Sequence, residues 1–124
     1  MQNSFFIKHD GMRHRIPYAD LLHIEAQKQY VKFVTAQHAY LTRLSLHVLE
    51  RTLPGDLFCR IHRSFIISLE HLQGINHDIA LVAGQPLPIG RAYRSSLEGR
   101  VMIIDGFMMM TKHEINRISV ALKK

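Results

Sequence analysis

A mainly β domain is the fold class that this sequence predicts, and three features lead to it. Short runs that alternate apolar and polar residues follow one another through the first two-thirds of the chain. Turn-forming pairs such as Asp10-Gly11 and Pro54-Gly55 separate them. Few stretches have the apolar spacing of a helix. With 124 residues, the chain has the length of one domain.

The expected strands are short and joined mainly by tight turns. Asp10-Gly11 favours a hairpin between the first two strands, and Gln27-Lys28-Gln29 is the expected turn between the next two. In YVKFV, alternation directs Val31 and Phe33 to one face and leaves Lys32 in the open on the other. The expected strand ranges are 4–9, 12–17, 21–26, 30–36, 38–43 and 64–69, followed by two short strands around a turn at His77-Asp78.

Two short helices interrupt these strands. Ser45 begins the first helix and Pro54-Gly55 ends it, and its apolar residues recur at helical spacing. These residues are Leu46, Leu49 and Leu53. A short helical turn is expected within 92–99. Prolines cannot donate backbone hydrogen bonds, so Pro86 and Pro88 assign QPLPI to a sheet edge or a loop.

The final segment, residues 99–124, is expected to extend a core formed by residues 1–98. Asp105-Gly106 between VMII and FMMM predicts a hairpin. Thr111 and Glu114 form a capping box that begins a helix. The apolar face of this helix consists of Ile115, Ile118 and Leu122. The extension either closes an open face of the core or forms a homodimer surface, since methionines adapt to irregular apolar contacts.

The charge of the chain indicates an anionic partner. The formal net charge is +6 and the sequence pI is 9.8, which fits nucleic acid, a membrane surface or an acidic protein. No apolar run is close to the length of about 20 residues that is needed to span a bilayer. The first residues lack the apolar core of a secretion signal. A single cysteine, Cys59, excludes an internal disulfide and fits a cytoplasmic, reducing compartment.

Basic residues at the ends of apolar strands are the candidates for binding an anion. In RIHRSF, Arg60, Arg63 and Ser64 precede the apolar run FII, and unpaired arginine is costly to bury. These arginines therefore either pair with Glu70 or Asp56 or meet an external anion. A second pair, Arg91 and Arg94, follows Gly90, which allows a turn or a close approach of the backbone. The alternative for this pair is a solvated helix start.

The turn Gln27-Lys28-Gln29-Tyr30 is the third candidate. Amide side chains can bond adenine in a bidentate manner, and lysine meets phosphate. An ordinary polar hairpin turn is the alternative. The alternation of side chains along the expected strands suggests Lys32 and Arg43 as further phosphate contacts.

Several segments together resemble the LytTR family of bacterial DNA-binding domains. They are LLHIEAQKQYVKF, TRLSLHVLERTLPGDLFCRIHRSFIISLEHLQGI and LPIGRAYRSSL, within Ser4 to Leu97. Ser68 departs from the family pattern, which usually has asparagine there. The resemblance implies an elongated, mostly antiparallel β fold whose loops enter successive major grooves, often at imperfect direct repeats in promoters. It also implies that the RIHRS segment, the Gln27–Tyr30 turn and the LPIGR.Y segment face DNA.

Metal and catalytic sites are weaker interpretations of the same residues. Cys59-x-x-His62 has metal-ligand spacing, but the sequence offers no matched second pair, since His71 and His77 are scattered. His62 is expected to hydrogen-bond locally and shape its turn. Ser64 beside His62 lacks the third group that orients a base, and no glycine-rich phosphate loop is present.

The sequence thus predicts a sequence-specific double-stranded DNA-binding module of a bacterial transcriptional regulator, of the kind that forms the output domain of response regulators. It is not expected to be an enzyme or to need a cofactor or metal. The alternatives are a basic module that binds an acidic protein, and an RNA binder. Base-stacking aromatics would favour RNA, and the candidates are Tyr30, Tyr40 and Tyr93.

Overall fold

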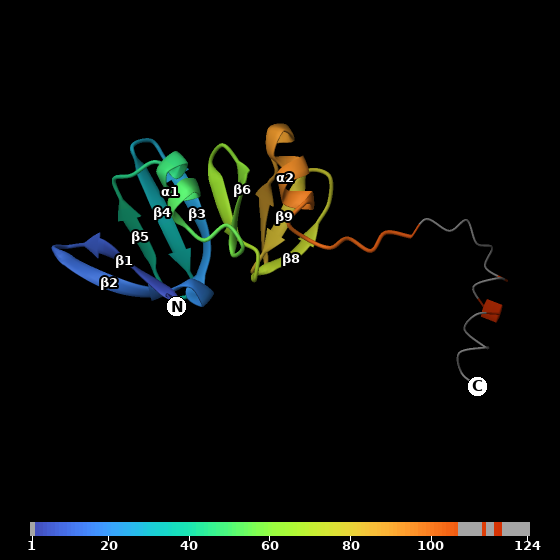
Figure 1. Cartoon of the computed structure of the whole chain (residues 1–124), viewed down its shortest axis with the longest axis horizontal. Helices are drawn as coiled ribbons and strands as arrows, with labels where there is room; N and C mark the ends of the chain where they lie inside the picture. The colour runs from blue at the N-terminus through green and yellow to red at the C-terminus, as the bar shows by residue number, and fades with distance from the viewer. Residues whose placement is uncertain (1, 107–112, 114–115, 118–124) are drawn as a thin grey trace.

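Antiparallel strands in three sheets follow one another along the long axis of the molecule (Figure 1). The structure is a computed structural model that describes residues 2–106, 113, 116 and 117. Within these residues, strands predominate and two short α-helices flank them. The predicted mainly β class is confirmed.

The first sheet is the predicted hairpin. Strands β1 (Ser4–His9) and β2 (Met12–Pro17) pair in full register. Asp10 and Gly11 have φ of 53° and 74°, the left-handed values that a tight two-residue turn requires. One face of the hairpin places Ile7 and Ile16 in the larger of two hydrophobic clusters.

The second sheet has five strands in the order β5-β4-β3-β7-β6. Its strands are β3 (Leu21–Gln27), β4 (Tyr30–Thr35), β5 (Ala39–Thr42), β6 (Phe58–His62) and β7 (Phe65–Ser68). Val31 and Phe33 are buried as predicted. Lys32 corrects an expectation, because its half-buried side chain lies 3.8 Å from Glu25 on the neighbouring strand instead of standing in the open.

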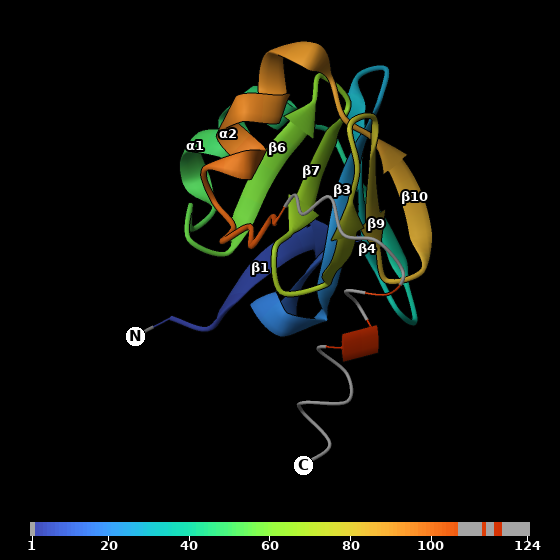
Figure 2. The same ribbon diagram turned by 90° about the vertical axis from the view of Figure 1, so that its right-hand side faces the viewer.

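The two helices flank β6, which forms one edge of this sheet (Figures 1 and 2). Helix α1 spans Leu46–Thr52, and the hydroxyl of its predicted N-cap, Ser45, accepts a hydrogen bond from Val48 N at 3.3 Å. The 3₁₀ turn η2 (Arg91–Tyr93) leads directly into α2 (Arg94–Glu98). A further 3₁₀ turn, η1 (Tyr18–Asp20), precedes β3.

The third sheet contains β8 (Leu72–Ile75), β9 (Ile79–Val82) and β10 (Gln85–Pro88) in the order β10-β9-β8. Pro86 and Pro88 lie on an edge strand, as their missing N–H groups predict. This sheet and α2 share a second hydrophobic cluster with Cys59, Ile61 and Ile67. Phe58 and Ile66 face the first cluster, so strands β6 and β7 are apolar on both faces.

The C-terminal extension is described in part. Residues 102–106 form no strand, and the side chains of Met102 and Ile104 are exposed, so the first half of the predicted hairpin is absent. The capping box of Thr111 and Glu114 and the apolar stripe of the predicted helix lie outside the described residues. That stripe is Ile115, Ile118 and Leu122. Packing of the extension on the core or on a second copy stays a prediction. No helix within the described part of the chain has the length and apolarity to cross a bilayer.

Candidate nucleic-acid interface

Three turns from different parts of the sequence meet at one edge of the molecule, the upper edge in Figure 1. They are the β3–β4 turn, the β6–β7 turn and the η2 turn. Backbone hydrogen bonds join them: Ala26 N donates to Ser64 O at 2.9 Å, and Gly90 N donates to Ile61 O at 2.7 Å. The structure therefore brings together all three segments that the sequence identified as candidates.

The β3–β4 turn is tighter than predicted. Gln27 pairs with Tyr30, which leaves a two-residue turn of Lys28 and Gln29 instead of three residues. Lys28 has a φ of 58°, a left-handed conformation that costs a non-glycine residue roughly 1–2 kcal/mol. Residues 27–30 are all exposed. A strained and solvated turn of this kind projects its side chains away from the sheet.

An open groove of about 430 Å³ lies beside this turn. Its basic lining combines the predicted residues Lys28, Arg43, Arg60 and Arg63 with His47. His47 was missed by sequence reasoning, because it looks like an ordinary polar position on α1. His47 lies at the groove because β5 ends beside it, and the chain continues through Arg43 into the start of α1.

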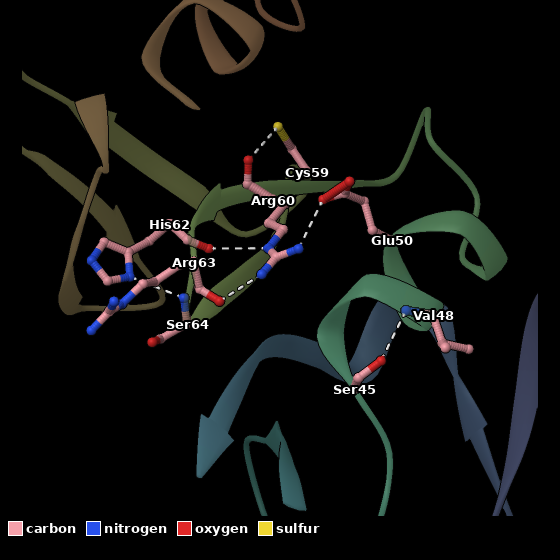
Figure 3. A network of polar contacts seen from close by, with 8 residues as sticks. All are labelled: Ser45, Val48, Glu50, Cys59, Arg60, His62, Arg63 and Ser64. Atoms are coloured by element: carbon pink, nitrogen blue, oxygen red, sulfur yellow. Dashed lines mark hydrogen bonds and ion pairs between the residues drawn. The ribbon is translucent and has the colours of Figure 1, made fainter. Parts of the chain in front are cut away.

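The β6–β7 turn carries Arg63, whereas Arg60 lies on strand β6 just before the turn. His62 Nδ1 accepts a hydrogen bond from Ser64 N at 3.0 Å, which confirms that His62 shapes the turn. Arg63 is exposed, whereas Arg60 is largely covered and lies 3.5 Å from Glu50 of α1. The partner is neither Asp56 nor Glu70, the carboxylates expected from the sequence. Figure 3 shows the side chain of Arg63 extending away from the guanidinium of Arg60.

The η2 turn meets the β6–β7 segment at Gly90, whose N donates to Ile61 O at 2.7 Å. A Cβ at this position would make ordinary contact with His62 Cα at 3.6 Å but would crowd Tyr93 Cδ2 at 3.1 Å. Arg91 is exposed beside this contact. Arg94 is half-buried, and its Nε donates to His77 O at 3.0 Å, which ties α2 to the β8–β9 turn.

Apart from Arg94, which bonds His77 O, the cations at this edge fall into two groups. Arg60 and Lys32 are paired with carboxylates of their own chain, Glu50 and Glu25. Over the part of the chain that the structure describes, no carboxylate is in ion-pair contact with the other group, which consists of Lys28, Arg43, Arg63 and Arg91. This second group lies exposed around the three turns. The edge therefore presents positive charge that the folded chain does not neutralise.

Cys59 of β6 and His23 of β3 are both buried. Cys59 is buried, and burial raises the pKa of its thiol, with Arg100 acting in the opposite direction. Burial likewise lowers the pKa of His23, opposed by Glu25 and reinforced by Lys32. Among the described residues, no three histidine, cysteine or carboxylate side chains gather in a metal-binding arrangement.

Comparison with known proteins places this chain in a family. Residues 12–102 match the model of the LytTr DNA-binding domain. A LytTr DNA-binding domain of Bacillus cereus has a similar structure, with a TM-score of 0.69 and 23% identity over 81% of this chain and 97% of that chain. The structural likeness supports the fold and confirms the antiparallel architecture that the sequence resemblance implied.

Two longer proteins show the same relationship in sequence. The CO-responsive transcriptional regulator RcoM of Rhodospirillum rubrum is 36% identical over 92 residues, which are 68% of this chain and 39% of that protein. The sensory transduction protein LytT of Bacillus subtilis is 27% identical over 85 residues, 64% of this chain and 35% of LytT. The matched region thus spans little more than a third of either relative. The match over residues 12–102, most of the chain, shows that the protein belongs to the LytTR family of DNA-binding domains.

Proposed function

We propose that this chain binds double-stranded DNA in a sequence-specific manner as part of a cytoplasmic transcriptional regulator, with its three clustered turns entering successive major grooves. One observation carries the proposal: turns from β3–β4, β6–β7 and η2 share an edge on which Lys28, Arg63 and Arg91 are exposed. Duplex DNA is a regular array of phosphates that such an edge can follow. The function is one of binding, and no catalytic step is proposed.

The exposed cations differ in what they can recognise. Arg63 and Arg91 stand on backbone that hydrogen bonds and Gly90 hold in place. A rigidly held guanidinium can bond guanine O6 and N7 in a bidentate manner. Lys28 carries a flexible point charge at the tip of an exposed turn, which suits phosphate. Gln27, Gln29 and Tyr30 share this tip and can contact base edges in the same groove.

Some predicted contact residues are already engaged within the protein. Lys32 pairs with Glu25 and Arg94 bonds to His77 O, so both contribute to DNA binding mainly by supporting their turns. Ser64 belongs to the turn itself, through Ser64 N to His62 Nδ1. Its hydroxyl remains a candidate phosphate donor.

Duplex DNA is favoured over RNA by the surroundings of the three candidate stacking aromatics. Tyr30 is 47% exposed, but Tyr40 lies against the rings of His9, His14 and His38. Tyr93 lies beneath the guanidinium of Arg60. A single open ring is a poor platform for stacking successive bases.

Selection of bound duplexes from a random DNA pool tests the proposal directly. Enrichment of a direct repeat supports it, with two copies of the protein on neighbouring repeats. Lack of enrichment, together with binding to acidic protein surfaces or to RNA, would support the alternatives.

Variants then assign the roles. Arg63→Ala or Arg91→Ala should cost about 1–3 kcal/mol on the selected site and flatten discrimination at one base position. Lys28→Gly removes a cation and relieves the left-handed backbone, so it should weaken all duplexes alike without lowering the melting temperature. If both arginine variants keep full discrimination, direct readout by this pair is wrong.

A further inference from the structure

Arg60 occupies a position that differs from every other arginine at the interface edge. Its side chain is only 16% exposed and lies on the face of β6 that packs toward α1. The guanidinium bonds backbone oxygens on one side and a carboxylate on the other, as Figure 3 shows. Its guanidinium therefore makes its polar contacts within the protein, although the side chain also lines the open groove beside the β3–β4 turn.

The backbone around Arg60 explains why donors are needed there. The pairing of β6 with β7 shifts register between Arg60 and His62, which is a β-bulge at Ile61. A bulge interrupts the ladder, so the neighbouring carbonyl groups need other partners. Ile61 O accepts from Gly90 N at 2.7 Å. His62 O accepts from Arg60 Nε at 3.3 Å.

The same guanidinium reaches three elements at once. Nη2 donates to Arg63 O at 2.7 Å, and Nη1 donates to Glu50 of α1 at 3.5 Å. The Cζ atom lies 5.5 Å from the ring centroid of Tyr93 in η2, within the range of a cation–π contact. Arg60 thus connects α1, the β6–β7 turn that carries Arg63, and the η2 turn that begins with Arg91.

We infer that Arg60 is a positioning residue that fixes the separation and orientation of Arg63 and Arg91, and so sets which base spacing the domain accepts. The inference rests on the proposed function of those two arginines. A planar group with several donors is required, because Nε and Nη2 donate to two carbonyl groups while the flat face of the guanidinium lies against the ring of Tyr93. A lysine would keep the charge but supply neither the planar set of donors nor the flat face.

The test compares Arg60→Lys with a matched control, Arg51→Lys, which changes an exposed arginine in the last turn of α1. Binding is measured to the selected duplex, to duplexes with one base pair inserted or removed between the contacted positions, and to unrelated duplex. Arg60→Lys should weaken binding to the selected duplex about tenfold, the size of one bidentate base contact. Its affinity for altered spacings and unrelated duplex, and its salt slope, should remain at the wild-type values. Arg51→Lys should behave as wild type throughout.

A second readout follows the turns in the free protein. Backbone amide signals of Arg63, Ser64 and Arg91 in a ¹⁵N spectrum should shift in Arg60→Lys and not in Arg51→Lys. Glu50→Ala removes an exposed carboxylate and leaves the core intact, so it should fold even if Arg60→Lys does not. It should shift the same amides and relax spacing discrimination to a smaller degree.

Three results would overturn the inference. The first concerns Arg60→Gln, which removes the charge. A shallower salt slope and an equal loss of affinity for every duplex in this variant would make Arg60 itself a phosphate contact. The second is full spacing discrimination in Arg60→Lys. The third is unchanged turn amides in Glu50→Ala. If the wild-type domain selects no preferred duplex, the proposed function fails instead, and the amide signals still decide whether Arg60 positions the turns.

Discussion

The salt dependence of DNA binding can be worked out from the two groups of cations at the interface edge. Four exposed cations, Lys28, Arg43, Arg63 and Arg91, have no carboxylate in ion-pair contact within the described chain. Arg94 is not counted, because it is half-buried and its Nε already donates to His77 O. Each cation that neutralises a phosphate contributes about −0.9 to the slope of log K against log salt. We therefore expect a slope of about −3.6 per bound domain, so that doubling the salt weakens binding roughly 12-fold.

A count made from the sequence gives a different value. Six basic residues, Lys28, Lys32, Arg60, Arg63, Arg91 and Arg94, predict a slope of about −5 and a roughly 30-fold loss of affinity per doubling of salt. They include Arg60 and Lys32, which the fold pairs with Glu50 and Glu25. Titration of a labelled duplex by fluorescence anisotropy over a series of salt concentrations separates the two slopes.

Single variants make the assay sharper. Arg43→Ala should reduce the magnitude of the slope by about 1, because Arg43 lines the groove beside Lys28. Arg51→Ala removes an equal charge from the last turn of α1 and should leave the slope unchanged. A wild-type slope of about −5 or steeper would mean that Arg60 and Lys32 leave their carboxylates on binding. Affinity independent of salt would refute the electrostatic account altogether.

Three further predictions concern stability and assembly. Ser45→Ala removes the N-cap acceptor of Val48 N and should lower the free energy of unfolding by about 1 kcal/mol, measured by urea denaturation; an unchanged midpoint would show that the cap is dispensable. Burial lowers the folded-state pKa of His23 below the about 6.5 of the unfolded chain, so the unfolded state binds the extra proton as the pH falls below 6.5. Stability should decrease there by at most about 1.4 kcal/mol per pH unit until the folded pKa is reached, and His23→Gln should reduce this dependence. Deletion of residues 101–124 should lower solubility or convert a dimer to a monomer; an unchanged melting temperature and solution mass would show that the extension is dispensable.

The parts of the fold that follow from neighbouring residues could be predicted from the sequence. The first hairpin follows from Asp10-Gly11, since two left-handed residues fix its register locally. Helix α1 follows from Ser45 and the leucine spacing. The edge position of β10 follows from Pro86 and Pro88. Each of these depends on interactions within a few residues of chain.

The errors arise where a side chain depends on packing between distant segments. Lys32 was expected in the open, but cross-strand pairing places Glu25 directly opposite it. The partner of Arg60 could not be chosen from the sequence, because Glu50 becomes its neighbour only when α1 packs beside β6. The three candidate turns follow from their residue types and from the family resemblance, but their assembly at one edge depends on sheet order and on the hydrogen bond from Gly90 N to Ile61 O.

The segment RIHRSF shows how one residue type acquires two roles. Strand alternation directs Arg60 toward α1, while the bulge at Ile61 carries the chain into a turn that leaves Arg63 exposed. Arg60 then donates to His62 O beside the bulge and to Arg63 O in the turn. The cost of placing arginine next to an apolar strand is offset within the protein for Arg60, whereas Arg63 is exposed and makes no ion pair within the described chain. Because the covered arginine stabilises the turn that presents the exposed one, replacing Arg60 and replacing Arg63 should impair the same base contact, and their effects in the double variant should be less than additive.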